Sequence, residues 1–209
     1  MKKEKHWSRF ADDFEKRVTY VAGEHNILAI KKILDKQRLK GRVLELGCGN
    51  GTYSEAIARH AQVLHATDLS PQMVSFCQSR YEDLPKNVVV EKQDCFNLTY
   101  SDREFDAVVM VNLLHIIPNP EAALTEAHRV LKTGGTIVVI SFTSSGMNFF
   151  SKLGMMYRYF RAYGKPPAGS RILTVELTRS MMEQTGFSVI LANLMGKGTK
   201  AVFARAVAL

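Results

Sequence analysis

Long hydrophobic runs and a cysteine framework are both missing from this sequence of 209 residues. No apolar stretch approaches the roughly 18 residues that a membrane-spanning helix needs, and the first residues lack the apolar segment of a signal peptide. We therefore expect a cytoplasmic protein. The three cysteines, Cys48, Cys77 and Cys95, are too few and too scattered for a set of disulfides or a cysteine metal site, so we expect free thiols and no bound metal.

Acidic residues are also scarce, with 20 Asp and Glu against 28 Lys and Arg, for a net charge of +8. The excess is uneven: residues 1–42 sum to +6, residues 43–142 to −5, and residues 143–209 to +7. A basic surface around an acidic centre could attract an anionic substrate, an anionic membrane or nucleic acid, or could simply be solvated. Charge alone leaves these alternatives open.

Three glycines at alternate positions, Gly47, Gly49 and Gly51, follow the apolar run 43–46. This pattern predicts a β-strand that ends in a tight turn and opens a helix, which is where open α/β sheets bind nucleotide-like ligands. The spacing is not that of a dinucleotide or Walker phosphate loop. Glu45, two residues before the first glycine, suits a cationic ligand better than a phosphate.

The stretch from Glu45 to Gly51 resembles motif I of the class I S-adenosylmethionine-dependent methyltransferases, whose cofactor carries a sulfonium and an ammonium group. Three glycines alone could also form a purely structural turn. The resemblance implies that this segment binds S-adenosylmethionine through Glu45, Gly47, Cys48, Gly49 and Asn50.

A second predicted strand, 63–68, ends in Asp68, whose two carboxylate oxygens could accept hydrogen bonds from both ribose hydroxyls. Ser70 and Pro71 then favour the start of a helix. By resemblance to the family, Leu69 and Met73 flank the adenine, although Met73 fits a core position nearly as well.

A third predicted strand, 87–91, leads to a loop that the family uses for the adenine ring. The resemblance implies that Asp94 receives the adenine amino group and that the backbone at Cys95 and Phe96 reaches the ring. Outside this order of motifs, an aspartate in a loop would usually be a turn residue.

The fourth predicted strand, 105–111, ends at Asn112, which we include among the cofactor-binding residues, and a fifth covers 136–142 after a glycine turn. His115 is the candidate general base, because in the resembled family this strand end faces the transferable methyl group. A structural histidine is the alternative.

Apolar strands that alternate with helices predict a parallel sheet covered on both faces. The resemblance implies an α/β fold: a Rossmann-like, seven-stranded, mostly parallel sheet with an antiparallel last strand. We predict a single methyltransferase domain over 1–209, with an N-terminal cap (1–40), a cofactor-binding core (41–142), a substrate-side insertion (143–173) and a closing helix and strands (174–209).

Residues 1–40 resemble the N-terminal cap of small-molecule methyltransferases, including the quinone-modifying type. Trp7, Phe14 and Tyr20 are therefore candidates for acceptor binding. Phe14 stands where many members have tyrosine, so it can stack on a ligand but cannot donate a hydrogen bond. Tyr20 could supply the missing hydroxyl.

The segment 144–167 is rich in methionine and aromatic residues, and its only charged residues are basic. Such a segment can form an adaptable acceptor wall, an interfacial helix or a lid packed on the core. Phe149, Met156 and Tyr159 are its candidate acceptor-binding residues.

These observations predict S-adenosylmethionine-dependent methyl transfer, by in-line displacement, to a small and fairly apolar acceptor with an O, N, S or C nucleophile. One alternative is a nucleic-acid methyltransferase; against it, residues 112–115 lack the Pro-Pro-aromatic motif of amino-directed base methylation, and no RNA-binding module is present. Another is a non-catalytic cofactor-binding protein. Peripheral contact with an anionic membrane and the oligomeric state stay open.

Overall fold

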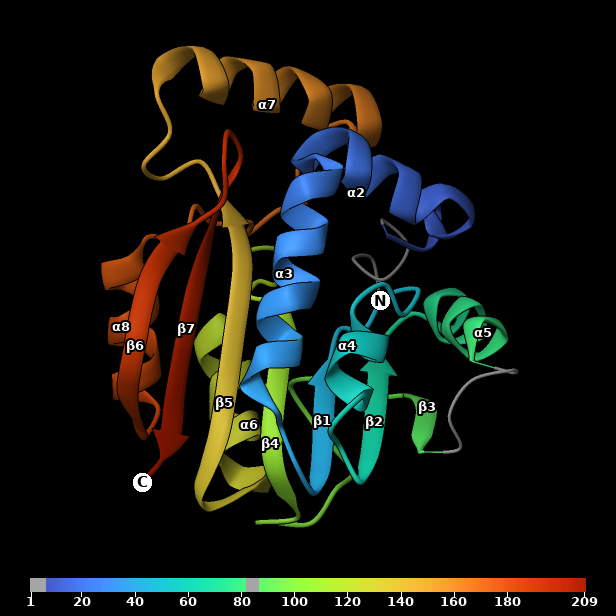
Figure 1. The fold of residues 1–209 in the computed structure, drawn as a ribbon, viewed down its shortest axis with the longest axis vertical. Coiled ribbons are helices and arrows are strands. Elements are labelled where there is room, and N and C mark those ends of the chain that lie inside the picture. The colour runs from blue at the N-terminus through green and yellow to red at the C-terminus, as the bar shows by residue number, and fades with distance from the viewer. Residues whose placement is uncertain (1–6, 82–86) are drawn as a thin grey trace.

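The computed structural model describes residues 7–81 and 87–209, so residues 1–6 of the predicted cap lie outside the described residues. Its centre is a seven-stranded sheet in the order β3-β2-β1-β4-β5-β7-β6 (Figure 1). The strands are β1 (Arg42–Leu46), β2 (Val63–Asp68), β3 (Val88–Lys92), β4 (Phe105–Val111), β5 (Leu131–Thr143), β6 (Phe187–Met195) and β7 (Lys200–Ala208).

The strands β1 to β5 pair in parallel, and β7 runs antiparallel to both β5 and β6. The predicted Rossmann-like, mostly parallel sheet with its antiparallel closing strand is therefore confirmed. The helices are η1 (Ala11–Asp13), α2 (Phe14–Ala22), α3 (Glu24–Gln37), α4 (Ser54–Ala58), α5 (Pro71–Arg80), α6 (Pro120–Val130), α7 (Phe149–Tyr163) and α8 (Val175–Gln184).

Two apolar layers cover the two faces of the sheet, because successive side chains of a strand point to opposite sides. Leu44 in β1 belongs to the layer with Leu124 of α6 and Met182 of α8. Val43, its neighbour in the chain, belongs to the other layer, with Ile30 of α3 and Ile57 of α4. Both faces of the sheet are covered by apolar side chains, as the continuous apolar strands of the sequence predict.

Strand β5 begins earlier than the sequence predicts. The expected turn at Gly134 and Gly135 lies inside this strand, where pairing with β4 jumps from Phe105–Leu131 to Ala107–Thr136. Gly134 has φ of +76°, a conformation that favours glycine. The glycine pair therefore makes a local irregularity at the start of β5 and not a separate turn.

The N-terminal 40 residues divide into two parts with different positions. Helix α3 buries Ile27, Ile30 and Leu34 against one face of the sheet, so it is a covering helix of the core. Helix α2 instead packs against α7, and both lie above the carboxyl ends of the parallel strands in Figure 1. In the part of the chain that the structure describes, no helix is long and apolar enough to cross a membrane.

Candidate functional site

The glycine turn after β1 adopts the conformation that its sequence requires. Gly47, Gly49 and Gly51 have backbone φ angles of +74°, +55° and +79°, values that residues with a Cβ rarely adopt. A Cβ on Gly49 would lie 3.5 Å from Cε1 of Phe14, so the cap places an aromatic ring directly over the turn. Any larger residue at Gly49 would therefore be strained as well as close to whatever binds there.

Asp68, at the end of β2, holds this turn in place. Its Oδ2 accepts a hydrogen bond from the N–H of Gly49 at 3.0 Å, and its Oδ1 accepts one from the N–H of Ser70 at 2.9 Å. Each carboxylate oxygen can accept more than one hydrogen bond, so Asp68 can also bind ligand hydroxyls. The same side chain thus supports the fold of the turn, and its binding of the ribose stays a prediction.

Glu45, in β1, is 1% exposed, and its Oε2 accepts a hydrogen bond from the hydroxyl of Ser54 at 2.5 Å. Burial raises the pKa of this carboxyl to about 7, the hydrogen bond from Ser54 opposes the rise, and the nearby charge of Asp68 adds to it. A cationic ligand would favour the ionised form and lower this pKa again. Within the described residues no basic side chain pairs with Glu45.

The loop after β3 has the polarity that adenine recognition requires. Oδ1 of Asp94 accepts a hydrogen bond from the N–H of Phe96 at 3.0 Å. The N–H of Cys95 donates to no other residue in the described part of the chain and lies close only to the thiol of its own residue, so a ligand could accept a hydrogen bond from it. Burial raises the pKa of the Cys95 thiol to about 12, and the nearby charges of Asp94 and Asp68 add to the rise. The ends of β2 and β3 therefore lie close enough for their acidic groups to act on the same thiol.

The remaining motif residues differ in how accessible they are. Leu69 is 39% exposed beside Asp68 and can pack on a flat ring, whereas Met73 is 2% exposed. The side chain of Asn50 accepts a hydrogen bond from the hydroxyl of Thr52. Cys48 is buried, and its contact with the Cys77 thiol raises its pKa. Leu69 therefore offers the more accessible apolar surface of the pair predicted to flank the adenine.

Asn112 marks the end of β4 with a left-handed backbone, at φ of +57°. Its N–H donates to the carbonyl of Ile140, and its side-chain oxygen accepts a hydrogen bond from the N–H of Phe142. These bonds to β5 maintain an unusual conformation for a residue other than glycine, which is a feature of functional sites. Burial raises the pKa of the Tyr53 phenol, and the nearby side chain of Asn112 partly offsets this rise.

His115 lies three residues beyond Asn112. Burial lowers the pKa of its imidazole to about 4, so the ring is neutral at pH 7. Its Nδ1 is buried without a hydrogen-bond partner among the described residues, and its backbone carbonyl accepts a hydrogen bond from the N–H of Arg171. A buried, unpaired ring nitrogen suits a contact with a bound molecule.

Aromatic rings connect the glycine turn to a cavity between the cap and the end of α7. Phe14, which covers Gly49, has its ring 6.3 Å from that of Trp7, and Trp7 lies 5.4 Å from Tyr163. Tyr163 also contacts Tyr159, at 5.3 Å, and Phe10. These contacts gather three of the predicted acceptor-binding residues, Trp7, Phe14 and Tyr159.

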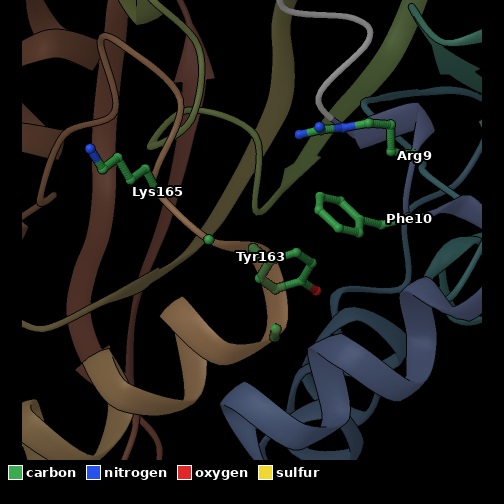
Figure 2. A pocket seen from close by; sticks show the side chains of 6 residues that line it. Arg9, Phe10, Tyr163 and Lys165 are labelled. Atoms are coloured by element: carbon green, nitrogen blue, oxygen red, sulfur yellow. The ribbon is translucent and has the colours of Figure 1, made fainter.

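The cavity itself has a volume of about 580 Å³ and is lined by Arg9, Phe10, Ala162, Tyr163, Gly164 and Lys165. Figure 2 shows Arg9 and Lys165 on opposite sides, with the rings of Phe10 and Tyr163 between them. No ion pair involves either cation among the described residues. The cavity therefore combines apolar walls with positive charge.

None of the six predicted acceptor-binding residues lines this cavity directly. Trp7 and Tyr159 contact Tyr163, which does line it. Tyr20 is 45% exposed on α2, and Phe149 and Met156 are 72% and 51% exposed on α7. Helix α7 is apolar on both sides, so its sequence could not indicate which side faces inward. An acceptor role for Tyr20, Phe149 or Met156 stays a prediction without support from the geometry.

Sequence reasoning missed Tyr53 and Tyr163. Both hydroxyls are buried without a hydrogen bond of normal geometry among the described residues, although the side chain of Asn112 lies close enough to the Tyr53 hydroxyl to lower its pKa. Tyr53 follows the glycine turn directly, and Tyr163 is the last residue of α7 before Gly164. Position relative to the glycine turn could have identified Tyr53. Nothing in the sequence singles out Tyr163 among the aromatic residues of its segment.

Comparison with known proteins agrees with this geometry. Residues 44–139, which hold the glycine turn, Asp68, Asp94 and Asn112, match the family of methyltransferase domains. Residues 44–139 therefore form a methyltransferase domain of the S-adenosylmethionine-dependent class. S-adenosylmethionine is the cofactor of this fold family, as the sequence predicts.

Among curated relatives of this methyltransferase domain, the ubiquinone biosynthesis O-methyltransferase of Coxiella burnetii is 30% identical over 139 residues, which cover 66% of this chain and 53% of the relative. The chain thus spans about half the length of the curated relatives it matches.

Two solved structures share the fold over nearly the whole chain. A putative methyltransferase in complex with the Trm112 activator of Haloferax volcanii superposes with a TM-score of 0.75 and 15% identity, covering 97% of both chains. A possible histamine N-methyltransferase of Thermotoga maritima has a TM-score of 0.72 and 22% identity, covering 97% of this chain and 98% of the other.

The residues of this site fit the cofactor. A cationic ligand needs acidic groups that are not already neutralised, and neither Glu45 nor Asp94 forms an ion pair within the described residues. The ligand also needs hydrogen-bond donors, and the N–H of Cys95 is available. Asp68, Leu69 and Asp94 would hold the ribose and adenine, and Glu45 would lie near the cationic end.

Proposed function

We propose that this protein transfers a methyl group from S-adenosylmethionine to a small, fairly apolar acceptor that binds in the cavity between the cap and α7. The observation that supports this proposal is a continuous series of aromatic rings. It begins with Phe14, which lies over Gly49, and continues through Trp7 to Tyr163. It gives a flat apolar acceptor a surface that extends from the glycine turn into the cavity.

The acceptor that we propose carries an anionic group. Arg9 and Lys165 lie on the cavity walls without acidic partners among the described residues. A carboxylate or phenolate would be attracted to them, and the rings of Phe10 and Tyr163 would pack on its apolar part. The name of the curated relative, an O-methyltransferase of ubiquinone biosynthesis, agrees with an acceptor of this class.

The cofactor, when bound, supplies an electrophilic methyl group on a sulfonium. The chain's own residues then mainly hold the two reactants in line and exclude water. Asp68 and Asn112 fix the strand ends on either side of the glycine turn. The rings of Trp7 and Phe14 pack over the glycine turn and limit the access of water to it.

His115 is proposed to contact the acceptor. With a pKa of about 4, its imidazole is neutral at pH 7 and can accept a hydrogen bond, but it is a weak base. Such a group is sufficient for an acceptor whose own nucleophile loses its proton easily. Replacing His115 with glutamine should lower kcat without changing cofactor affinity, and should alter the acid limb of the pH–rate profile.

A panel of acceptors with radiolabelled S-adenosylmethionine tests this function. Catechols, phenols with and without a carboxylate, thiols, amines and hydroquinones should be compared at equal concentration with the purified protein. We expect methylation of an aromatic acceptor, with a lower KM for the carboxylated compound. Replacing Arg9 and Lys165 with glutamine should abolish that difference in KM; equal KM values in the unaltered protein would contradict the anionic acceptor.

Two alternatives predict other outcomes of the same assay. A nucleic-acid methyltransferase would label tRNA or DNA and none of the small acceptors. A non-catalytic protein would bind the cofactor and label nothing. A cytoplasmic location and contact with an anionic membrane also remain predictions at this stage.

A further inference from the structure

Helix α7 presents an apolar face that nothing in the described structure covers. Six large apolar residues on this helix are each between 47% and 81% exposed: Phe149, Phe150, Leu153, Met156, Tyr157 and Phe160. Their spacing places them on one side of the helix, at about 100° per residue. Scattered exposed apolar residues are normal, but a contiguous stripe of this kind marks an interaction surface.

The opposite side of α7 is fixed to the body of the protein. Arg158 donates a hydrogen bond from Nε to the carbonyl of Val21 at 3.3 Å, and Arg17 of α2 donates one to the carbonyl of Ala162. Helix α2 packs against α7 along this side, while the helix lies at the edge of the molecule in Figure 1. The apolar face is therefore held outward by the fold.

Positive charge borders the apolar face. At about 100° per residue, the exposed side chains of Lys152 and Arg161 fall on the two sides of the stripe. No acidic residue occurs anywhere from position 127 to position 175. The surface thus combines an apolar centre with cationic margins, which complements a layer that is apolar inside and anionic outside.

We propose that the outward face of α7 docks on an anionic lipid bilayer, with the helix lying in the plane of the membrane. The helix has 15 residues, fewer than the roughly 20 needed to span a bilayer. Lys152 and Arg161 are long enough to reach lipid phosphates while the rings enter the acyl boundary. A second copy of the chain fits less well, because a two-fold contact would bring the cationic margins of one face against those of the other.

Vesicle flotation tests this proposal with the full chain. Phosphatidylcholine vesicles with and without phosphatidylglycerol should be incubated with the protein at low and high salt. We expect flotation with the phosphatidylglycerol vesicles, weaker flotation with phosphatidylcholine alone, and loss at high salt. Failure of the unaltered protein to float with phosphatidylglycerol vesicles at low salt would overturn the proposal.

A matched pair of variants locates the surface. Replacing Phe150, Leu153 and Tyr157 with glutamine should weaken vesicle binding by about tenfold or more. The control variant replaces Ile190 and Leu191 with glutamine as well. These residues are 61% and 46% exposed on β6, so the change removes apolar surface elsewhere and should leave vesicle binding unchanged. Both variants are folded if their melting temperatures equal those of the unaltered protein, measured once without and once with S-adenosylhomocysteine. Equal binding by both variants would overturn the assignment to α7.

A charge variant and a mass measurement separate the occupants of the surface. Lys152→Glu with Arg161→Glu should abolish the preference for phosphatidylglycerol. Analytical ultracentrifugation without lipid should give a monomer for the protein and for the glutamine triple variant. A dimer that dissociates only in the triple variant would overturn the proposal in favour of a second copy of the chain.

Discussion

The parallel sheet has one edge at the amino ends of its strands, here the amino edge, and one at their carboxyl ends, the carboxyl edge. The acidic residues at these two edges have different partners. At the amino edge, Asp102, Glu104 and Asp106 each form an ion pair, with Arg129, Arg42 and Lys132 at 2.6–2.8 Å. At the carboxyl edge, Glu45 and Asp94 form no ion pair among the described residues, and their partners are hydroxyl and amide groups.

We infer from this difference that the amino edge has a structural role and that the carboxyl edge is the binding surface. The acidic groups of the amino edge are paired with cations, although Nε of Arg42 is buried there without a partner among the described residues. In the same part of the chain, the carboxyl edge holds acidic groups without cationic partners, the available N–H of Cys95 and buried hydroxyls without partners. Buried polar groups without partners are rare and call for an explanation. A cationic cofactor and a polar acceptor would supply the partners that the protein itself does not.

The largest expected effect concerns Glu45. Its folded-state pKa of about 7 lies above the value of about 4.5 expected when unfolded, so the unfolded chain loses this proton first. Stability should therefore fall as pH rises from about 4.5 to about 7, by on the order of 3 kcal/mol, and stay level above that range. Thermal melts from pH 4 to 8 should show this decline in the unaltered protein.

Glu45→Gln supplies the control, because glutamine keeps the shape and the hydrogen bond from Ser54 but cannot ionise. The difference in stability between the variant and the unaltered protein should grow from pH 4.5 to 7. Affinity for S-adenosylmethionine should rise with pH through about 7 only in the unaltered protein. A pH-independent difference would mean that folding does not raise the pKa of Glu45.

The second prediction compares Asp68 with Asp106, one aspartate from each edge. Asp68→Ala removes the acceptor for the predicted ribose hydroxyls and for the N–H of Gly49, so cofactor affinity should fall by about 1.5–3 kcal/mol. Stability should fall too, since two backbone N–H groups lose their acceptor. The comparison uses calorimetric titration and denaturant unfolding on the same samples.

Asp106→Ala is the matched variant. It removes an ion pair with Lys132 and a hydrogen bond from the N–H of Arg42, so it should cost stability. Its distance from the carboxyl edge should leave cofactor affinity unchanged within about twofold. If both variants lost cofactor affinity equally, the two edges would not differ in function.

The third prediction concerns the hydroxyl of Tyr163, which is buried beside the cavity without a partner among the described residues. Tyr163→Phe keeps the ring contacts with Trp7 and Phe10 but removes the hydroxyl. The specificity constant for the acceptor should fall about fivefold, by the value of one hydrogen bond, with cofactor affinity unchanged. Steady-state kinetics at saturating cofactor measure this; an unchanged acceptor KM and kcat would exclude a contact.

The smallest expected effect belongs to the amino edge. Lys132 and Asp106 form an exposed ion pair at 2.6 Å, with 48% and 37% of their side chains accessible. Lys132→Ala should cost about 0.2–1 kcal/mol of stability, and the cost should shrink at high salt. Denaturant unfolding at two salt concentrations gives this value. A change in cofactor affinity would again contradict the separation of the two edges.

Much of the sheet could be predicted from the sequence because parallel strands buried on both faces are continuous apolar runs. The bounds of β2 and β4 match the predicted ones. The order of motifs also placed Asp68 and Asp94 at neighbouring strand ends. The glycine spacing predicted the turn, since only glycine adopts its three left-handed conformations readily.

The contacts between distant segments could not be predicted. The outward direction of Phe149 and Met156 depends on how α2 packs against α7. A helix with large apolar residues on two of its sides gives no indication of which of them faces inward. The support that Asp68 gives to Gly49 depends on the distance between two strand ends. The neutral state of His115 depends on burial, which its neighbours in sequence do not specify.

The central claim, that the carboxyl edge alone binds the cofactor, is tested most directly by NMR titration of the 15N-labelled protein with S-adenosylhomocysteine. The account predicts saturable shifts at the backbone N–H groups of Gly47, Gly49, Cys95 and Asn112, and none at Arg42 or Asp106. It also predicts that ATP and NAD leave all these signals unchanged. Shifts centred on the amino edge, or no shifts with S-adenosylhomocysteine, would contradict it.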